Sequence, residues 1–125
     1  GQIGGFEAVR KSADMLIPDA LYRHRRGATD SEAFFLVALG NGMATDTLGA
    51  IARTITTFEA LATKTPKFRM TAAFSDGQKL YAVRYASDDR APTLYHRWSA
   101  SQQVRSFNVI TRTHQATFSL FLNIF

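Results

Sequence analysis

The sequence predicts one α+β domain whose helices come first and whose antiparallel strands follow. Up to about residue 63, apolar residues recur every three or four positions, which is the period of a helix. From Phe68 onward apolar and polar residues alternate, which is the period of a strand. Residues 64–67 (KTPK) separate the two patterns. A chain of 125 residues is long enough for one domain of this kind.

The composition favours some classes of function for this chain and excludes others. The chain has a net charge of +5 and a pI near 10.0, which raises nucleic acid or an anionic surface as a partner. It has no cysteine, which excludes disulfides, thiolate metal sites and a cysteine nucleophile within these residues. No apolar run reaches the roughly 18 residues of a spanning helix, so we expect no membrane partner. Because the chain opens on GQI without Met, we expect that it does not begin at a natural start.

The first predicted helix covers residues 6–16. Its apolar residues are Phe6, Val9, Ala13 and Leu16, and Pro18 ends it. Residues 18–26 form a connector with one helical turn at 19–22. The connector ends in residues 23–26 (RHRR), which are either a phosphate-binding patch or a solvated loop; we favour the solvated loop, because no aromatic residue or glycine interleaves with the charges.

Residues 26–39 are the centre of the prediction. Thr29 can cap a helix by accepting from the amide of Glu32, while the carboxylate of Glu32 reaches back to the amide of Thr29. Asp30 then lies in the first turn, where the helix dipole favours a carboxylate. This motif is either a capping box alone or a frame that holds Asp30 ionised for a cationic group. The following residues, up to Leu39, are apolar nearly all round, so we expect the helix to be deeply buried.

Residues 40–42 (GNG) end that helix, and Thr45 or Asp46 caps the next one, which runs to about Thr63. Its apolar stripe consists of five residues: Leu48, Ile51, Ile55, Phe58 and Leu61. The sequence places four polar residues largely outside this stripe: Thr54, Thr56, Thr57 and Glu59.

Two strands follow, at about 68–75 and 79–86, with Asp76-Gly77 as a hairpin turn between them. A two-residue turn sets three cross-strand pairs: Ala72 with Tyr81, Met70 with Val83 and Phe68 with Tyr85. Both faces of this hairpin carry mostly apolar residues, so we expect helices or another sheet to pack on both. Asp88-Asp89 is interpreted as a solvated turn.

Three further segments complete the predicted chain. Residues 93–98 are a third strand, and residues 102–111 are a candidate strand. Residues 117–125 are a final strand or an apolar tail that leans toward membranes or aggregation.

Three motifs, read together, resemble one family. They are residues 1–6 (GQIGGF), residues 26–32 (RGATDSE), and residues 75–85 (SDGQKLYAVRY) followed by residues 92–95 (PTLY). Over about residues 1–98 the chain resembles the middle of a class II glutamine amidotransferase of the N-terminal-nucleophile type. The branch it resembles includes the ergothioneine-pathway amidohydrolase and the glutathione-degrading amidotransferase-like proteins.

The resemblance implies part of a four-layer αββα fold and a cytoplasmic enzyme without metal or organic cofactor. In this family an N-terminal cysteine attacks the side-chain amide of glutamine or a γ-glutamyl amide, and its own α-amino group is the base. Gly1 matches the oxyanion-hole glycine and acts through its backbone. Asp30 matches the aspartate that contacts the substrate α-ammonium, with Thr29 and Glu32 as supporting residues.

The chain lacks several residues that the family pattern requires. The nucleophile, the oxyanion asparagine and the arginine for the α-carboxylate would all lie upstream of Gly1, so we expect residues 1–125 alone to release no ammonia from glutamine. We expect a partial glutamine amidotransferase type-2 domain at 1–99 and a divergent tail at 100–125. The expected partner is glutamine or a γ-glutamyl small molecule, with neither nucleic acid nor membrane, and a homo-oligomer is left open.

Two alternatives of other classes stay open at this point. One is a non-catalytic nucleic-acid module that uses Arg23, Arg25, Arg26 and the basic tail, which salt-dependent binding would support. The other is a regulatory domain of the same fold that has no catalytic activity.

Overall fold

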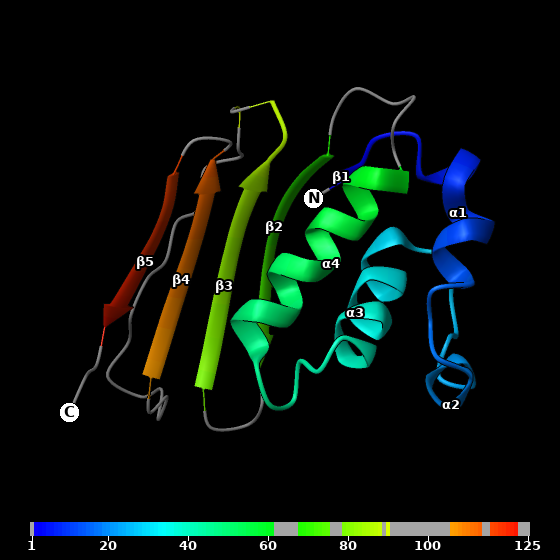
Figure 1. Cartoon of the computed structure of the whole chain (residues 1–125), viewed down its shortest axis with the longest axis horizontal. Helices are drawn as coiled ribbons and strands as arrows, with labels where there is room; N and C mark the ends of the chain where they lie inside the picture. The colour runs from blue at the N-terminus through cyan, green and yellow to red at the C-terminus, as the bar shows by residue number, and fades with distance from the viewer. Residues whose placement is uncertain are drawn as a thin grey trace. The chain divides into compact units, whose positions relative to one another are not determined.

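The computed structural model describes residues 2–61, 68–75, 79–88, 90, 106–113 and 116–122. The chain divides into two compact units, residues 2–66 and residues 67–125, the latter grouped with Gly1. The first unit is helical and the second is a sheet (Figure 1). Within the described residues, no helix has both the length and the apolar character needed to cross a membrane.

The helical unit contains a two-residue strand and four helices. They are β1 (Gln2–Ile3), α1 (Phe6–Asp14), α2 (Asp19–Tyr22), α3 (Asp30–Gly40) and α4 (Thr47–Leu61). All four predicted helical segments are confirmed.

Helix α1 begins after Gly5, whose φ of 69° is a left-handed conformation that favours glycine. It ends at Asp14, two residues before the predicted end at Leu16. The reason is that the amides of Leu16 and Ile17 bond to carbonyls three residues back, which tightens the chain into a turn before Pro18. Leu16 therefore lies off the packed stripe and is 38% exposed.

Helix α3 starts as the sequence predicts, with Thr29 as its N-cap and the amide of Glu32 donating to the Thr29 hydroxyl at 3.3 Å. Five of its residues are buried: Ala33, Phe34, Leu36, Val37 and Ala38. The prediction of burial on every side is wrong for Phe35, which is 40% exposed. The rings of Phe34 and Phe58 lie 5.4 Å apart, so α3 packs against α4 through an aromatic pair.

Helix α4 is capped by Asp46, whose Oδ1 accepts from the amide of Gly49 at 3.1 Å. Its predicted apolar stripe is confirmed at Ile51, Ile55 and Phe58, which are nearly completely buried. The prediction that Thr54 lies outside the stripe is wrong, because this residue has no exposed surface. Burial is tolerated because its hydroxyl is satisfied twice: it donates to the carbonyl of Ala50 at 2.7 Å and accepts from the side-chain amide of Asn41 at 2.9 Å.

The sheet unit contains four strands, β2 (Phe68–Ser75), β3 (Lys79–Ala86), β4 (Ser106–Thr113) and β5 (Ala116–Leu122), in the order β2-β3-β4-β5. The pairs β2–β3 and β4–β5 are antiparallel. The pair β3–β4 is parallel, which corrects the prediction of antiparallel strands throughout. Strands β4 and β5 match the predicted segments near 102–111 and 117–125.

The register of β2 against β3 differs from the prediction by two residues. Met70 lies opposite Tyr85 and Ala72 opposite Val83, and the last pair is Ser75 with Leu80. Four residues therefore separate this last pair, whereas the prediction assumed a two-residue turn. Since side chains alternate with a period of two, the shift preserves both faces, and the predicted grouping of residues on each face is retained.

A bidentate ion pair holds the far end of the hairpin. Arg69 donates from Nη2 to Asp88 Oδ2 at 2.6 Å and from Nε to Oδ1 at 3.1 Å. These hydrogen bonds lower the pKa of Asp88 to about 2. The interpretation of Asp88 as a solvated residue is therefore wrong. The Asp76-Gly77 turn, Asp89 and the predicted strand at 93–98 lie outside the described residues.

Candidate functional site

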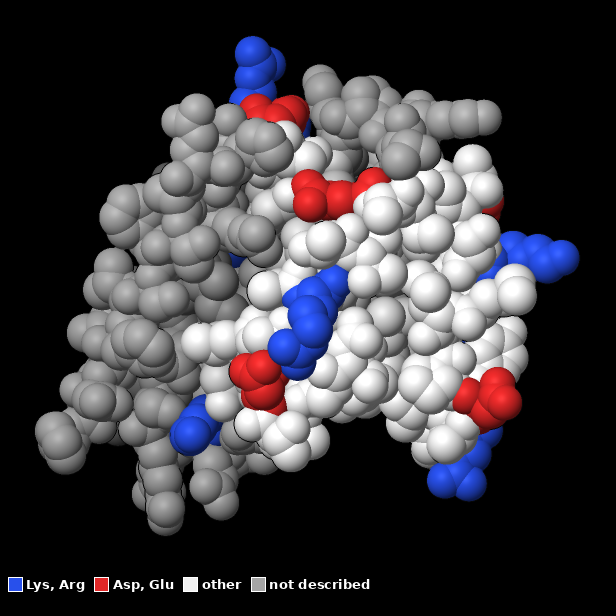
Figure 2. Space-filling view, in the orientation of Figure 1, with Lys and Arg blue, Asp and Glu red and all other residues white. Residues whose placement is uncertain are grey.

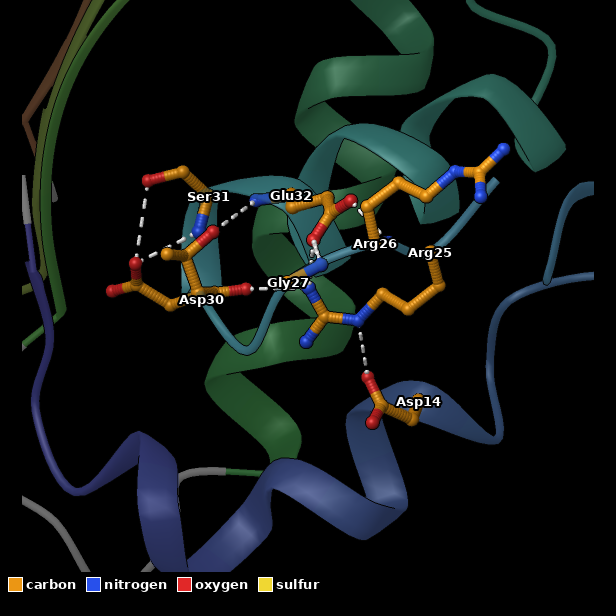
Figure 3. A network of polar contacts seen from close by, with 8 residues as sticks. Asp14, Arg25, Arg26, Gly27, Asp30, Ser31 and Glu32 are labelled. Atoms are coloured by element: carbon orange, nitrogen blue, oxygen red, sulfur yellow. Dashed lines mark hydrogen bonds and ion pairs between the residues drawn. The ribbon is translucent and has the colours of Figure 1, made fainter. Parts of the chain in front are cut away.

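The carboxylate of Asp30 lies at the N-terminus of α3 and is held by backbone and side-chain donors (Figure 3). Its Oδ2 accepts from the amide of Ile3 at 2.8 Å. Its Oδ1 accepts from the amide of Ser31 at 2.7 Å and from the Ser31 hydroxyl at 3.3 Å. The first contact joins residues 27 positions apart, so it fixes β1 to the start of α3.

Asp30 has no ionic partner within the described part of the chain. The ion pairs found there are Arg25–Asp14, Arg25–Glu32, Arg53–Asp46 and Arg69–Asp88. A carboxylate offers about four acceptor positions, and the three hydrogen bonds to Asp30 occupy two on Oδ1 and one on Oδ2. Asp30 therefore keeps about one acceptor position, on Oδ2, for a further donor.

Thr29 and Glu32 support this arrangement, but only Thr29 acts as predicted. The Glu32 carboxylate does not complete a capping box with the amide of Thr29. It instead accepts from the amide of Arg26 at 2.7 Å, from that of Gly27 at 2.9 Å and from Arg25 Nη1 at 2.7 Å. These donors, with the two backbone amides foremost, lower the pKa of Glu32. The physical reason for the correction is that the loop before Thr29 curls back over the helix start and presents two free amides and a cation.

The prediction that residues 23–26 form a solvated loop is wrong for Arg25. Its side chain is only 5% exposed, so it is not part of a solvated loop. Nε donates to Asp14 Oδ1 at 3.0 Å, and Nη1 donates to the carbonyl of Thr29 at 2.9 Å as well as to Glu32. No local pattern predicts this, because its carboxylate partners lie eleven and seven residues away.

The pairing of Arg25 also weakens the nucleic-acid alternative. Arg25 forms ion pairs with two carboxylates, so its guanidinium is not available to bind phosphate. In Figure 2, acidic side chains lie beside several of the basic ones. Arg23 and Arg26 are exposed, but two arginines make a small electrostatic footprint.

Other features of the described residues do not add to this site. They contain no group of three His, Cys, Asp or Glu residues that could hold a metal ion. A surface hollow of about 730 Å³ is lined by residues of α1, α2 and their connector, among them Glu7, Lys11, Met15 and Tyr22, but by none of the predicted site residues. Gly1, the predicted oxyanion-hole glycine, lies outside the described residues.

Comparison with solved structures finds a protein that is similar over most of this chain. It is a glutamine aminotransferase class-II domain protein from Silicibacter pomeroyi, with 53% sequence identity and a TM-score of 0.75. The match covers 81% of this chain and 48% of that protein, so this chain spans about half of its length. No protein-family model matches the chain. No curated protein matches it either. Over most of its length the chain is therefore similar to a class II domain protein of this kind.

Proposed function

We propose that this chain is part of a class II amidotransferase-like amidohydrolase that takes glutamine or a γ-glutamyl amide, and that Asp30 binds the α-ammonium group of the substrate. The observation that carries the proposal is the state of Asp30. Its carboxylate is fixed by the amides of Ile3 and Ser31 yet has no cation beside it within the described residues. The 53% identity to a class II domain protein supports the choice of substrate class.

The chemistry of an ammonium group fits the remaining acceptor position of Asp30. A charge-assisted N–H···O bond is shorter and about twice as strong as a neutral one. The donors already in place hold the carboxylate still, so little side-chain entropy is lost when the substrate binds. Asp30 also lies in the first turn of α3, at the positive end of the helix dipole.

The remaining parts of the reaction are assigned to residues upstream and to Gly1. An N-terminal cysteine would form a thioester with the γ-glutamyl group, release ammonia or an amine, and return to the thiol by hydrolysis. Gly1 would donate its backbone amide to the oxyanion during both steps. The proposal includes a cytoplasmic enzyme that needs neither metal nor organic cofactor, and it allows a homo-oligomer.

The test begins with the coding sequence upstream of Gly1. We expect it to supply a Met-Cys start, an arginine and a His-Asn pair directly before Gly1. The protein translated from that start should release ammonia from glutamine or a γ-glutamyl amide in a coupled assay. A Met-Cys protein that hydrolyses neither compound would refute the amidohydrolase.

The role of Asp30 is tested in the same longer protein by Asp30→Asn. Removing an ionic hydrogen bond costs about 1.5–3 kcal/mol, which corresponds to a KM raised roughly 10- to 150-fold. Asp19→Asn is the matched control, because Asp19 is exposed and is the first residue of α2, as Asp30 is of α3. An unchanged KM in active Asp30→Asn, or an equal rise in the control, would remove Asp30 from the binding site.

A further inference from the structure

We propose that Arg25 is a positioning residue for Asp30, a role that rests on the proposed function of Asp30. Arg25 contacts three groups: Asp14 at the end of α1, the peptide group that precedes Asp30, and Glu32 (Figure 3). It acts through these groups and does not itself touch Asp30.

The first link runs through the backbone. The carbonyl of Thr29 belongs to the same planar peptide group as the amide of Asp30. Because Arg25 Nη1 donates to this carbonyl at 2.9 Å, the guanidinium fixes the plane from which the Asp30 side chain departs. The same nitrogen donates to Glu32 Oε2 at 2.7 Å, and Glu32 in turn accepts from the amides of Arg26 and Gly27. The whole loop before Asp30 is therefore tied to one cation.

The second link runs through helix α1. Arg25 Nε donates to Asp14, the last residue of that helix. The opposite end of α1 follows Ile3, whose amide donates to Asp30 Oδ2. Fixing the end of α1 at Asp14 limits the movement of this helix, which the chain joins to Ile3 through Gly4 and Gly5. Arg25 thus acts directly on the backbone before Asp30 and, through α1, on the segment that carries its amide donor.

The geometry requires arginine at this position. Three acceptors approach from different directions, and the planar fork of a guanidinium meets them while a lysine ammonium offers one centre. The third nitrogen, Nη2, is buried and has no hydrogen-bond partner among the described residues. Leaving that nitrogen unsatisfied has a cost in stability.

The test compares Arg25→Lys with Arg53→Lys in the 125-residue chain. Arg53 is the matched control because it also bridges a carboxylate, Asp46, and a backbone carbonyl, that of Asn41, but lies on α4. Amide hydrogen exchange, followed by NMR, should show the Ile3 amide exchanging at least tenfold faster in Arg25→Lys. The amides of α4 should keep their rates, and Arg53→Lys should leave Ile3 unchanged.

Two results of this experiment would overturn the proposal. One is an Ile3 amide that exchanges at the original rate in Arg25→Lys. The other is an equal acceleration at Ile3 and throughout α4, which would mean that Arg25 only stabilises the fold. If Arg25→Lys does not fold, Asp14→Asn removes the α1 contact alone and is expected to accelerate Ile3 exchange in the same direction; an unchanged rate there overturns the second link.

A kinetic arm uses the longer protein with the activity proposed above. Arg25→Lys should raise KM for glutamine at least fivefold with kcat within about twofold, and Arg25→Lys/Asp30→Asn should have the KM of Asp30→Asn alone. Fully additive effects would mean that Arg25 does not act through Asp30. If the longer protein has no amidohydrolase activity, the proposed function fails, while the exchange measurement still decides whether Arg25 fixes the Ile3–Asp30 contact.

Discussion

Replacing Thr54 by valine tests how the end of α3 is held against α4. Valine keeps the β-branched shape of threonine and differs little in helix propensity. The change removes the hydroxyl that accepts from the side-chain amide of Asn41, the C-cap of α3, at 2.9 Å. The variant therefore removes this hydrogen bond, at the opposite end of the helix that begins with Asp30, together with the hydrogen bond from the same hydroxyl to the carbonyl of Ala50.

The size of the effect follows from the burial of Thr54. Its side chain has no exposed surface, so the amide of Asn41, which is itself half-buried, loses its partner at a partly buried site. Leaving such a donor unsatisfied costs about 1–3 kcal/mol. The buried methyl group that replaces the hydroxyl returns about 0.8 kcal/mol. The net loss should be about 0.2–2 kcal/mol, or a fall in Tm of about 1–8 °C for a chain of this length.

The assay is urea unfolding followed by circular dichroism at 222 nm. Thr56→Val is the matched control: its hydroxyl also donates to the carbonyl four residues back, at 3.2 Å, but the residue is exposed. We expect the control to lie within about 0.5 kcal/mol of the original chain. A double-mutant cycle with Asn41→Ala should give a coupling energy of about 1 kcal/mol. Equal losses in the two valine variants, or no coupling, would refute the role of this hydrogen bond.

Two other outcomes concern Gly40 and Asp88. Gly40→Ala should destabilise the chain by about 1–3 kcal/mol in the same urea assay, because a Cβ there would lie 2.5 Å from Pro18 Cγ and 2.8 Å from Cδ; a gain in stability would contradict the packing. An NMR titration should give a pKa of about 2 for Asp88, and Arg69→Gln should raise this pKa toward 3.8. Because the pKa is lower in the folded chain, the stabilisation from this pair is complete above about pH 4 and is lost as the pH falls toward 2; a folded-state midpoint near 4 would argue against the pair.

The features that the sequence predicts correctly depend on residues within about four positions of one another. Thr29 and Asp46 cap their helices through amides three residues on, and the short helix α2 follows directly from Pro18. The alternation in β2 and β3 likewise predicts which residues share a face, even though the turn length and hence the register are two residues off.

The features that the sequence does not predict depend on partners far along the chain. Thr54 is polar and belongs by type to the surface, but Asn41, thirteen residues away, makes its burial possible. Arg25 resembles its exposed neighbours in sequence, and only the fold brings Asp14 and Glu32 to it. In the candidate site, the family resemblance identifies Asp30 and the local pattern identifies Thr29, whereas the Ile3 contact has no local signal.

The parallel pairing of β3 with β4 sets the order in which the sheet can assemble. Lys79 and its partner Ser106 are 27 residues apart in the chain, whereas the closing pair of the β2–β3 hairpin, Ser75 and Leu80, is five apart. Closing the longer loop costs about 1.5 kcal/mol more entropy, since this cost grows as the logarithm of loop length. We therefore expect the β2–β3 hairpin to form first, with the edge of β3 that pairs with β4 still unpaired. Until residues 106–113 pair with it, that edge of β3 can also pair with an extended segment of another chain, so we expect slow pairing of β4 to favour aggregation.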